Sequence, residues 1–473
     1  MFKVKRIIFS YHCLLLLLFT FTFCMPFQGR SQVDSTYKIY ENQIRDLLRS
    51  RGMEPVEIDS VLLKFSSYGL HSHEQLSVAL GSLYPSNEGI AFLVYFYQND
   101  TLQRVWIEPG RVVEIEKIAV KKRQLFDLQR QLMQGLSLNE LVANRLPVQR
   151  GILIEMSSTE DSTDFDQAVK EASALLFPKN WDTTCRHLVV IPALNIGVFP
   201  FCVLKPYKDL KMLMDRSSVT ICPSILDAVA VRMRIMKETY HEDEVAQMVD
   251  RKRTFDNYAD YYPRSFRPRR SVLVANPLYP SDTTVFFPDL PGAEKEVKEV
   301  MKQLDGNFML YAGLEALKSN ILQSINGADI AYFATHGMAD ETEPMAKSCI
   351  VLSGPKPYLT AKEIMDLRLD HSFTFPKLVV LSACQSGLGK YLDAGVVGLA
   401  RPFIIGGSSQ VVMSLWNIDD EATAYLMTRF MHHLRLPYLN CPSEPLRQAM
   451  LETRKLFPDP KYWAGFAVFG VDY

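Results

Sequence analysis

The strongest constraint on the fold of this chain is a repeated alternation of short apolar runs with amphipathic segments between residues 271 and 434. The apolar runs are four to seven residues long, which is typical of strands buried on both faces of a sheet. Strands that alternate with helices predict a mainly parallel α/β sheet covered by helices on both faces. The expected strands are 271–275, 308–311, 328–334, 349–352, 378–382 and 410–415.

The same alternation predicts the helices that join these strands. One of them, at residues 292–304, carries Glu294, Glu296 and Glu299, which we expect on its outer, solvated side. The expected helices are 292–304, 315–325, 361–367, 396–405 and 421–434.

The chain before residue 271 divides into three further regions. Residues 237–270 crowd charged side chains and tyrosines together without apolar periodicity, which indicates an exposed insertion. Residues 32–84 place apolar side chains at the spacing of short helices and show no signature of a tetratricopeptide repeat. Residues 85–236 predict strands at 90–97, 101–107, 112–118 and 187–191 and helices at 121–133, 138–146 and 164–177.

Residues 1–31 have the pattern of a secretory signal peptide. Three basic residues precede an apolar stretch at 7–24, and Gly29 and Ser31 provide small residues before Gln32. The apolar stretch is also close to the roughly 20 residues that span a bilayer, so an uncleaved membrane anchor is the alternative. We therefore expect a secreted or periplasmic protein, with an anchored form as the second interpretation.

The charge of the chain argues against nucleic acid as a partner. Lys and Arg number 52 and Asp and Glu number 53, for a formal net charge of −1. Basic clusters occur at 251–253 and 267–270, but acidic residues at 238–244 lie close by in the sequence. Because no overall field attracts polyanions, partners have to be inferred from local sites.

The cysteines favour neither a metal site nor a disulfide framework. Eight are present, two of them in the first 31 residues, and no CxxC pair occurs. Zinc sites usually contain such pairs, and a core of this size does not need disulfides for stability. We therefore expect no zinc site and no disulfide framework among the cysteines.

Candidate catalytic residues follow three of the predicted strands. Strand 328–334 leads into Thr335–His336–Gly337, strand 378–382 into Ala383–Cys384, and strand 410–415 into a loop with Asp419 and Asp420. Sites of open parallel sheets form at the carboxyl edge of the strands. If these strands are neighbours, His336 and Cys384 face one crevice, where imidazole can activate a thiol. The N–H groups of Gly337 and Cys384 would then hold a developing oxyanion. A buried structural cysteine and an ordinary His–Gly turn are the alternatives.

Several motifs in this order make the chain resemble the CHAT peptidase family, which is related to caspases and separases. Weaker similarity at 188–192, 199–201 and 223–225 extends the resemblance over about residues 85–473. The motifs that carry it are ATHG (334–337), LSACQSG (381–387), GVVGLAR (395–401), SLWNIDD (414–420), YWAGF (462–466) and FG (469–470).

The resemblance implies a caspase-like three-layer α/β sandwich, preceded by the short helical segment. It divides the chain into a non-catalytic half at 85–236 and a catalytic half at 271–473, separated by the insertion at 237–270. It also implies a cysteine peptidase with His336 as general base and acid and Cys384 as nucleophile. Peptide bonds of a protein or peptide substrate would be hydrolysed through a thioester, and neither a metal nor an organic cofactor would be needed.

The chain departs from the family pattern in three places. Upstream tetratricopeptide repeats, common in the family, are not evident. The Gly-Glu-Gly usually found after the cysteine motif reads Leu392–Asp393–Ala394–Gly395, and the proline usual after Trp416 is Asn417. These changes leave the pair intact, but the Asp-for-Glu change could alter substrate contacts.

Three carboxylates suggest a substrate preference. Asp393, Asp419 and Asp420 follow the nucleophile and the next strand, where they could bind a basic P1 side chain. Asp419 or Asp420 could equally cap the helix that starts near Glu421. A basic P1 preference would make the clusters in 251–270 candidate sites of self-cleavage. The alternative to a peptidase is a catalytically silent interaction or signalling module that is anchored at the membrane or exported across it.

Overall fold

The computed structural model describes most of the chain from residue 89 onward. Before it, only Arg45, Pro55–Val56, His73–Glu74 and Leu76–Ser77 are described, all of them helical. Several predictions concern residues outside the described ranges. These are the signal peptide, the rest of the short helical segment at 32–84, the helix at 138–146 and residues 237–267 of the insertion. The described ranges are 89–136, 165–181, 185–224, 268–280, 287–340, 343–370, 372–382, 399–416, 419–436 and 442–470, with the backbone of 390–392 and 395–397.

One sheet of eleven strands runs through the described part of the molecule, in the order β3-β2-β1-β4-β5-β16-β15-β12-β8-β6-β7. It is mainly parallel, and only the pairs β1–β2, β2–β3 and β15–β16 are antiparallel. Its strands are β1 (Ile90–Gln98), β2 (Thr101–Glu108), β3 (Arg111–Ala119), β4 (His187–Ile191), β5 (Ser218–Ile221), β6 (Arg270–Pro277), β7 (Asn307–Gly313), β8 (Ile330–Ala334), β12 (Leu378–Leu381), β15 (Gln410–Ser414) and β16 (Phe466–Gly470).

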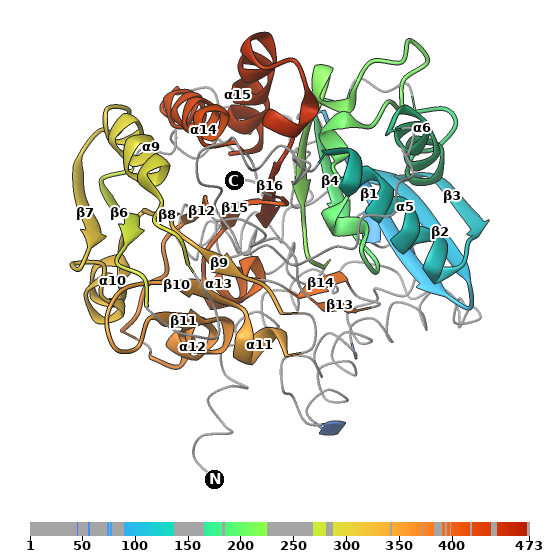
Figure 1. The fold of residues 1–473 in the computed structure, drawn as a ribbon. Helices are drawn as coiled ribbons and strands as arrows, with labels where there is room; N and C mark the ends of the chain where they lie inside the picture. The colour runs from blue at the N-terminus through green and yellow to red at the C-terminus, as the bar shows by residue number, and fades with distance from the viewer. Residues whose placement is uncertain are drawn as a thin grey trace, which may run out of the picture.

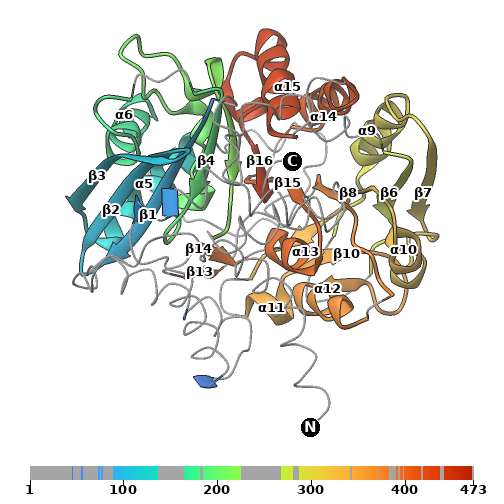
Figure 2. The same ribbon diagram turned by 180° about the vertical axis from the view of Figure 1, so that it is seen from behind.

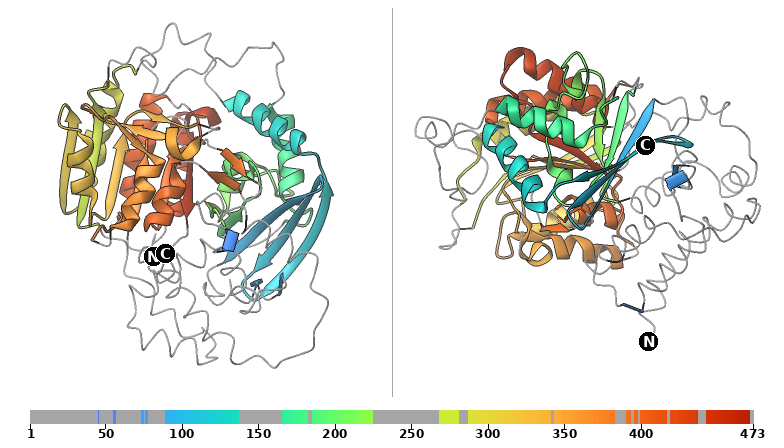
Figure 3. Two further views of the ribbon diagram at one scale, coloured as in Figure 1. Left: turned by 90° about the horizontal axis from the view of Figure 1, so that it is seen from below. Right: turned by 90° about the vertical axis from the view of Figure 1, so that its right-hand side faces the viewer.

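Helices cover both faces of the sheet, so the expected three-layer arrangement is confirmed. Helices α9, α14 and α15 lie above it and α10, α12 and α13 below it in both Figure 1 and Figure 2. Helices α5 and α6 contact each other near β1–β3 (Figure 3), and the end of α6 accepts hydrogen bonds from Tyr95 of β1 and Arg104 of β2. Their bounds are α5 (Lys122–Leu136), α6 (Phe165–Leu176), α9 (Pro291–Met301), α10 (Lys318–Ile325), α12 (Ala361–Asp366), α13 (Ala400–Gly406), α14 (Asp420–Leu434) and α15 (Ser443–Leu456).

The apolar runs form the expected strands because helices exclude water from both of their faces. Every residue of β4, β8, β12 and β15 is buried. Burial of both faces is what a parallel sheet between helices requires. The sequence therefore predicted the central strands well.

Several details differ from the expectations. Residues 396–397 belong not to a helix but to β14 (Gly395–Val397), which pairs with β13 (Lys390–Leu392); the helix begins only at Ala400. The strand at 349 is β10 (Cys349–Val351) of a small side sheet with β9 (Gly337–Met338) and β11 (Tyr358–Thr360). Glu296 is fully buried, because the Tyr332 hydroxyl donates to its carboxylate over 2.5 Å. Strand β5, the antiparallel strand β16 and helix α15 were not expected.

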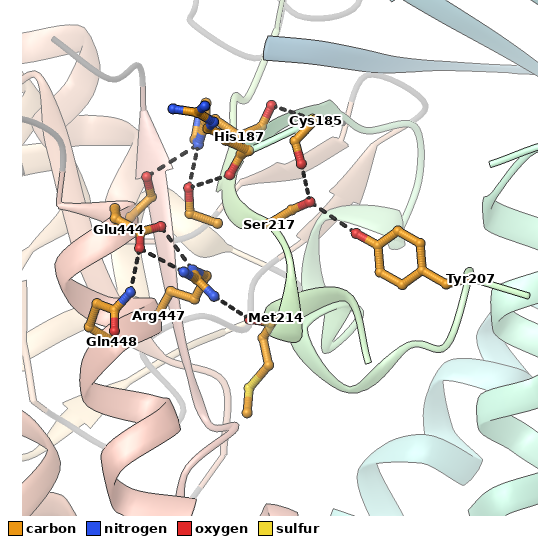
Figure 4. A network of polar contacts seen from close by, with 11 residues as sticks. Cys185, His187, Tyr207, Met214, Ser217, Glu444, Arg447 and Gln448 are labelled. Carbon is orange, nitrogen blue, oxygen red and sulfur yellow. Dashed lines mark hydrogen bonds and ion pairs between the residues drawn. The ribbon is translucent and has the colours of Figure 1, made fainter. Parts of the chain in front are cut away.

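Strand β16 joins the two halves of the chain into one sheet. It pairs antiparallel with β15 of the C-terminal half and parallel with β5 of the N-terminal half. The same join continues outside the sheet at the start of α15, where Ser443 Oγ lies 3.3 Å from His187 Nδ1. Arg447 also donates to the carbonyl of Met214 over 2.8 Å (Figure 4). The two halves therefore share both a sheet and a polar contact surface.

Within the described residues, no helix is both long and apolar enough to cross a membrane.

The close approach of β16 to β15 predicts that Gly470→Ala destabilises the fold. Gly470 has φ +125°, and a Cβ there would lie 2.2 Å from the carbonyl oxygen of Ser409. Backbone strain and the clash together should lower the free energy of unfolding by about 3 kcal/mol. Gly110→Ala is the matched control, because Gly110 has φ +83° but open space at its Cβ, and should cost only about 1 kcal/mol. Thermal unfolding of both variants measures the difference; equal midpoints would contradict the clash.

Candidate active site

The three strands that end in chemically interesting residues are neighbours. β12 pairs in parallel with β8 on one side and with β15 on the other. Leu381, the last residue of β12, stands opposite Phe333 of β8 and Met413 of β15. The carboxyl ends of the three strands therefore meet at one edge of the sheet, as the sequence predicted.

His336 lies two residues beyond β8 and is completely buried. Its Nε2 atom is 2.8 Å from the carbonyl oxygen of Pro288. A carbonyl oxygen only accepts, so Nε2 must carry the proton of this hydrogen bond. In the neutral ring, Nδ1 is consequently the basic nitrogen. Orientation of a histidine by a partner on its other nitrogen is what a general base requires.

Aromatic side chains hold the His336 ring from two sides. The Tyr279 ring lies 4.6 Å away in an edge-to-face arrangement, and the Phe287 ring is 5.4 Å away. Thr335 donates from its hydroxyl to the carbonyl of Val351 over 2.6 Å and lies 3.3 Å from the Tyr279 hydroxyl. These contacts leave the imidazole little freedom to rotate.

The main chain around His336 is held by the side sheet. The Val351 N–H donates to the His336 carbonyl over 2.9 Å, and Ile350 pairs with Gly337. Gly337, the first of the two expected oxyanion donors, is the first residue of β9. It directly follows His336 in the chain, so the side sheet positions both residues together.

Two of the predicted site residues, Cys384 and Asp393, lie outside the described residues. The structure describes the chain up to Ser382, which is buried at the end of β12. Cys384 follows Leu381 by three positions, and His336 follows Phe333 by three. Leu381 and Phe333 are paired, so the two strands end at the same register and the two residues follow these strand ends at equal spacing in the sequence.

Asp419 and Asp420 have structural partners. Asp419 is the N-cap of α14, and its carboxylate accepts from the N–H groups of Glu421 at 2.9 Å and Ala422 at 3.0 Å. Asp420 packs against the first turn of α9, where a Cβ on Gly292 would lie 2.1 Å from its Oδ2 atom. The capping alternative is thus observed for Asp419. The substrate role of these carboxylates stays a prediction.

Sequence reasoning missed three residues around the imidazole: Pro288, Tyr279 and Phe287. Pro288 acts through its main-chain carbonyl, which every residue type possesses, so no motif marks it. The two aromatic residues belong to the segment between β6 and α9, and their apolar character alone indicates only burial.

Three cysteines of the described part, Cys185, Cys202 and Cys349, are unsuited to nucleophilic chemistry. Burial raises the pKa of Cys185, Cys202 and Cys349 to about 12 in each case. A thiol is reactive as its thiolate, so these side chains are inert at neutral pH. Among the described residues Cys185, Cys202, Cys222 and Cys349 form no disulfide, and no cluster of His, Cys, Asp or Glu could hold a metal.

Comparisons with known proteins agree with this fold. The sequence profile described as CHAT domain matches residues 168–471. Tetratricopeptide repeat protein 28 is 24% identical over 330 residues in Homo sapiens and 28% identical over 244 residues in Mus musculus. These regions cover 61% and 43% of this chain but only 12% and 10% of the relatives. The chain thus corresponds to about a tenth of their length.

Among solved structures, Saccharomyces cerevisiae separase from its complex with securin is similar in fold. The TM-score is 0.51 at 9% sequence identity, and the similarity covers 92% of this chain and 33% of separase. This identity is too low to carry function, so the likeness concerns the caspase-like architecture alone.

The capping geometry predicts different effects for two substitutions of Asp419. Asp419→Ala removes the acceptor for two N–H groups and should cost about 1 kcal/mol of stability, whereas Asp419→Asn keeps a capping oxygen and should cost far less. Thermal unfolding measures both. A comparable loss in the two variants would show that the negative charge, not the cap, is what Asp419 contributes.

Proposed function

This chain belongs to the CHAT domain family, and on that premise we propose that it is a cysteine endopeptidase with a Cys384–His336 dyad. The observation that carries the proposal is the hydrogen bond from His336 Nε2 to the Pro288 carbonyl. It makes Nδ1 the basic nitrogen of a neutral imidazole, as proton transfer from a thiol requires. The matching register of β8 and β12 supports a position of Cys384 close to that nitrogen.

The proposed reaction follows from these groups. His336 accepts the thiol proton, and the Cys384 sulfur attacks the carbonyl carbon of the substrate peptide. The N–H groups of Gly337 and Cys384 stabilise the oxyanion. His336 then donates its proton to the leaving amine, and a thioester remains on Cys384. Water, deprotonated by His336, attacks the thioester and releases the second product.

A basic P1 preference remains part of the proposal, with Asp393 as the carboxylate that best supports it. Asp419 already caps α14, and Asp420 packs on α9. In the sequence, Asp393 falls between the residues of β13 and those of β14, shortly after Cys384. A desolvated Arg or Lys side chain would need such a charged partner. The substrate chain would bind in extended form along a strand edge.

A silent protein-binding module is the second candidate function. The similarity to a small part of tetratricopeptide repeat protein 28 favours it, because the name of that relative describes repeats rather than catalysis. In this case the fold would bind a protein partner without turnover. The buried, oriented imidazole favours the peptidase, since a binding surface does not need it.

The dyad predicts that Cys384→Ala abolishes peptide cleavage and that His336→Ala lowers it by about 10²–10⁴-fold. A fluorogenic library that varies P1 measures both, and Asp393→Asn should weaken the preference for Arg and Lys selectively.

Iodoacetamide at neutral pH should label Cys384 but not Cys185, Cys202 or Cys349, whose high pKa values make them internal controls. If both the Cys384→Ala and the His336→Ala variants still cleave peptides at the wild-type rate, the dyad is excluded. If the wild type neither cleaves peptides nor is labelled, the silent module is favoured.

We also propose that the protein is exported and that it cuts itself within 251–270. The intact mass of protein expressed with its N-terminus tests both ideas. Removal of residues 1–31 should occur in wild type and in Cys384→Ala alike, whereas the internal cut should occur in wild type alone. A full-length mass in the membrane fraction would indicate the uncleaved anchor instead, and an uncut but active wild type would exclude self-processing as the activating step.

A further inference from the structure

The segment that carries the Pro288 carbonyl is bound by the side chain of Asn276 from strand β6. Pro288 lies in the segment between β6 and α9 and has no N–H of its own with which to anchor the main chain. Its position therefore depends on the residues that follow it, Asp289 and Leu290. Both of these are bound by Asn276, the penultimate residue of β6.

Asn276 makes three hydrogen bonds at this point. Its Nδ2 donates to Asp289 Oδ1 over 2.8 Å and to Glu294 Oε1 over 3.2 Å, and its Oδ1 accepts from the Leu290 N–H over 2.8 Å. The side chain is buried, with 6% of its surface exposed. All three contacts lie within the two residues after Pro288 or the first turns of α9.

Both the backbone conformation and the hydrogen bonds at position 276 favour an asparagine. Asn276 has φ +43°, a left-handed conformation in which asparagine is several times more frequent than most residues. Leu290 occupies the N-cap position of α9 but makes no capping bond with its own side chain. An aspartate at 276 would keep the acceptor for Leu290, yet it would replace two donors by a carboxylate that faces Asp289 and Glu294.

From this geometry we infer that Asn276 is a positioning residue that sets the tautomer and orientation of His336 through the Pro288 carbonyl. The inference rests on the proposed function for its catalytic meaning, but two hydrogen bonds exist independently of it: one joins Leu290 to Asn276, and the other joins His336 Nε2 to Pro288, two residues earlier in the same segment of main chain. A residue that served only to cap α9 would affect stability and leave the imidazole unchanged.

The test is ¹⁵N NMR of histidine-labelled full-length protein, with the His336 signals assigned from a His336→Asn sample. Wild type should show the Nε2–H tautomer at position 336. In Asn276→Asp and Asn276→Gly, both compatible with a left-handed backbone, the signal should move towards a mixture of tautomers. The double variant Asn276→Asp/Asp289→Asn restores one donor–acceptor pair and should recover part of the wild-type signal.

Asn195→Ala is the matched control. Asn195 is also buried and donates from Nδ2 to the Leu125 carbonyl over 3.2 Å, but it lies in the N-terminal half. It should lower stability without changing the His336 signal. Unchanged His336 signals in the Asn276 variants, or a wild type without the Nε2–H tautomer, would overturn the inference.

Kinetics then separate the inference from the proposed function. If the chain cleaves peptides, the Asn276 variants should lose about 10- to 100-fold in kcat/KM, mainly in kcat, because small displacements of a catalytic group are costly. Wild-type cleavage with variants as active as wild type would reject the positioning role and keep the peptidase. A tautomer change in a chain that cleaves nothing would keep the positioning role and reject the peptidase.

Discussion

The parallel pairing of β8 with β12 is the constraint on which the candidate active site depends. Paired strands lie about 4.8 Å apart, and Phe333 stands opposite Leu381. Each of the two is followed after three residues by one member of the proposed dyad. A slip of the register by two residues would separate the strand ends by about 7 Å. The chemistry therefore depends on the packing that maintains this register, which is the burial of both strands between two layers of helices.

The sequence allowed the central sheet to be predicted because its strands are buried on both faces. Such strands are continuous apolar runs, and these remain visible without any knowledge of their partners. Prediction failed where a partner distant in sequence decided the structure. Glu296 was expected outside because carboxylates are usually solvated, yet Tyr332 supplies the hydrogen bond that permits burial. The assignment of Val396 to a helix failed for a different reason, because its cross-strand partner Tyr391 is only five residues away and the short hairpin of β13 and β14 was not recognised.

The candidate site was predictable to the extent that its residues act through side chains. His336 stood out because it follows a buried strand and precedes a glycine. Pro288 did not, because its contribution is a main-chain oxygen whose position only the folded chain defines. Asp419 was left between capping and substrate binding, and the geometry of two N–H donors was needed to observe the cap. Motifs thus identify reactive groups, whereas the groups that orient them are visible only in three dimensions.

Helix α9 explains how these orienting contacts are linked to one another. Its first turns are bound by Asn276 from β6 and contacted by Asp420 from α14. One turn further, Glu296 binds Tyr332 of β8, the strand that leads to His336. A buried carboxylate is costly unless it is hydrogen-bonded, so this contact disfavours any sliding of α9 along β8. The carbonyl before α9 and the imidazole after β8 are therefore connected by two routes, one direct and one through the helix. Helix α14 begins where the loop after β15 ends, and it packs against α9. Helix α9 therefore also connects His336 to the residues that follow β15.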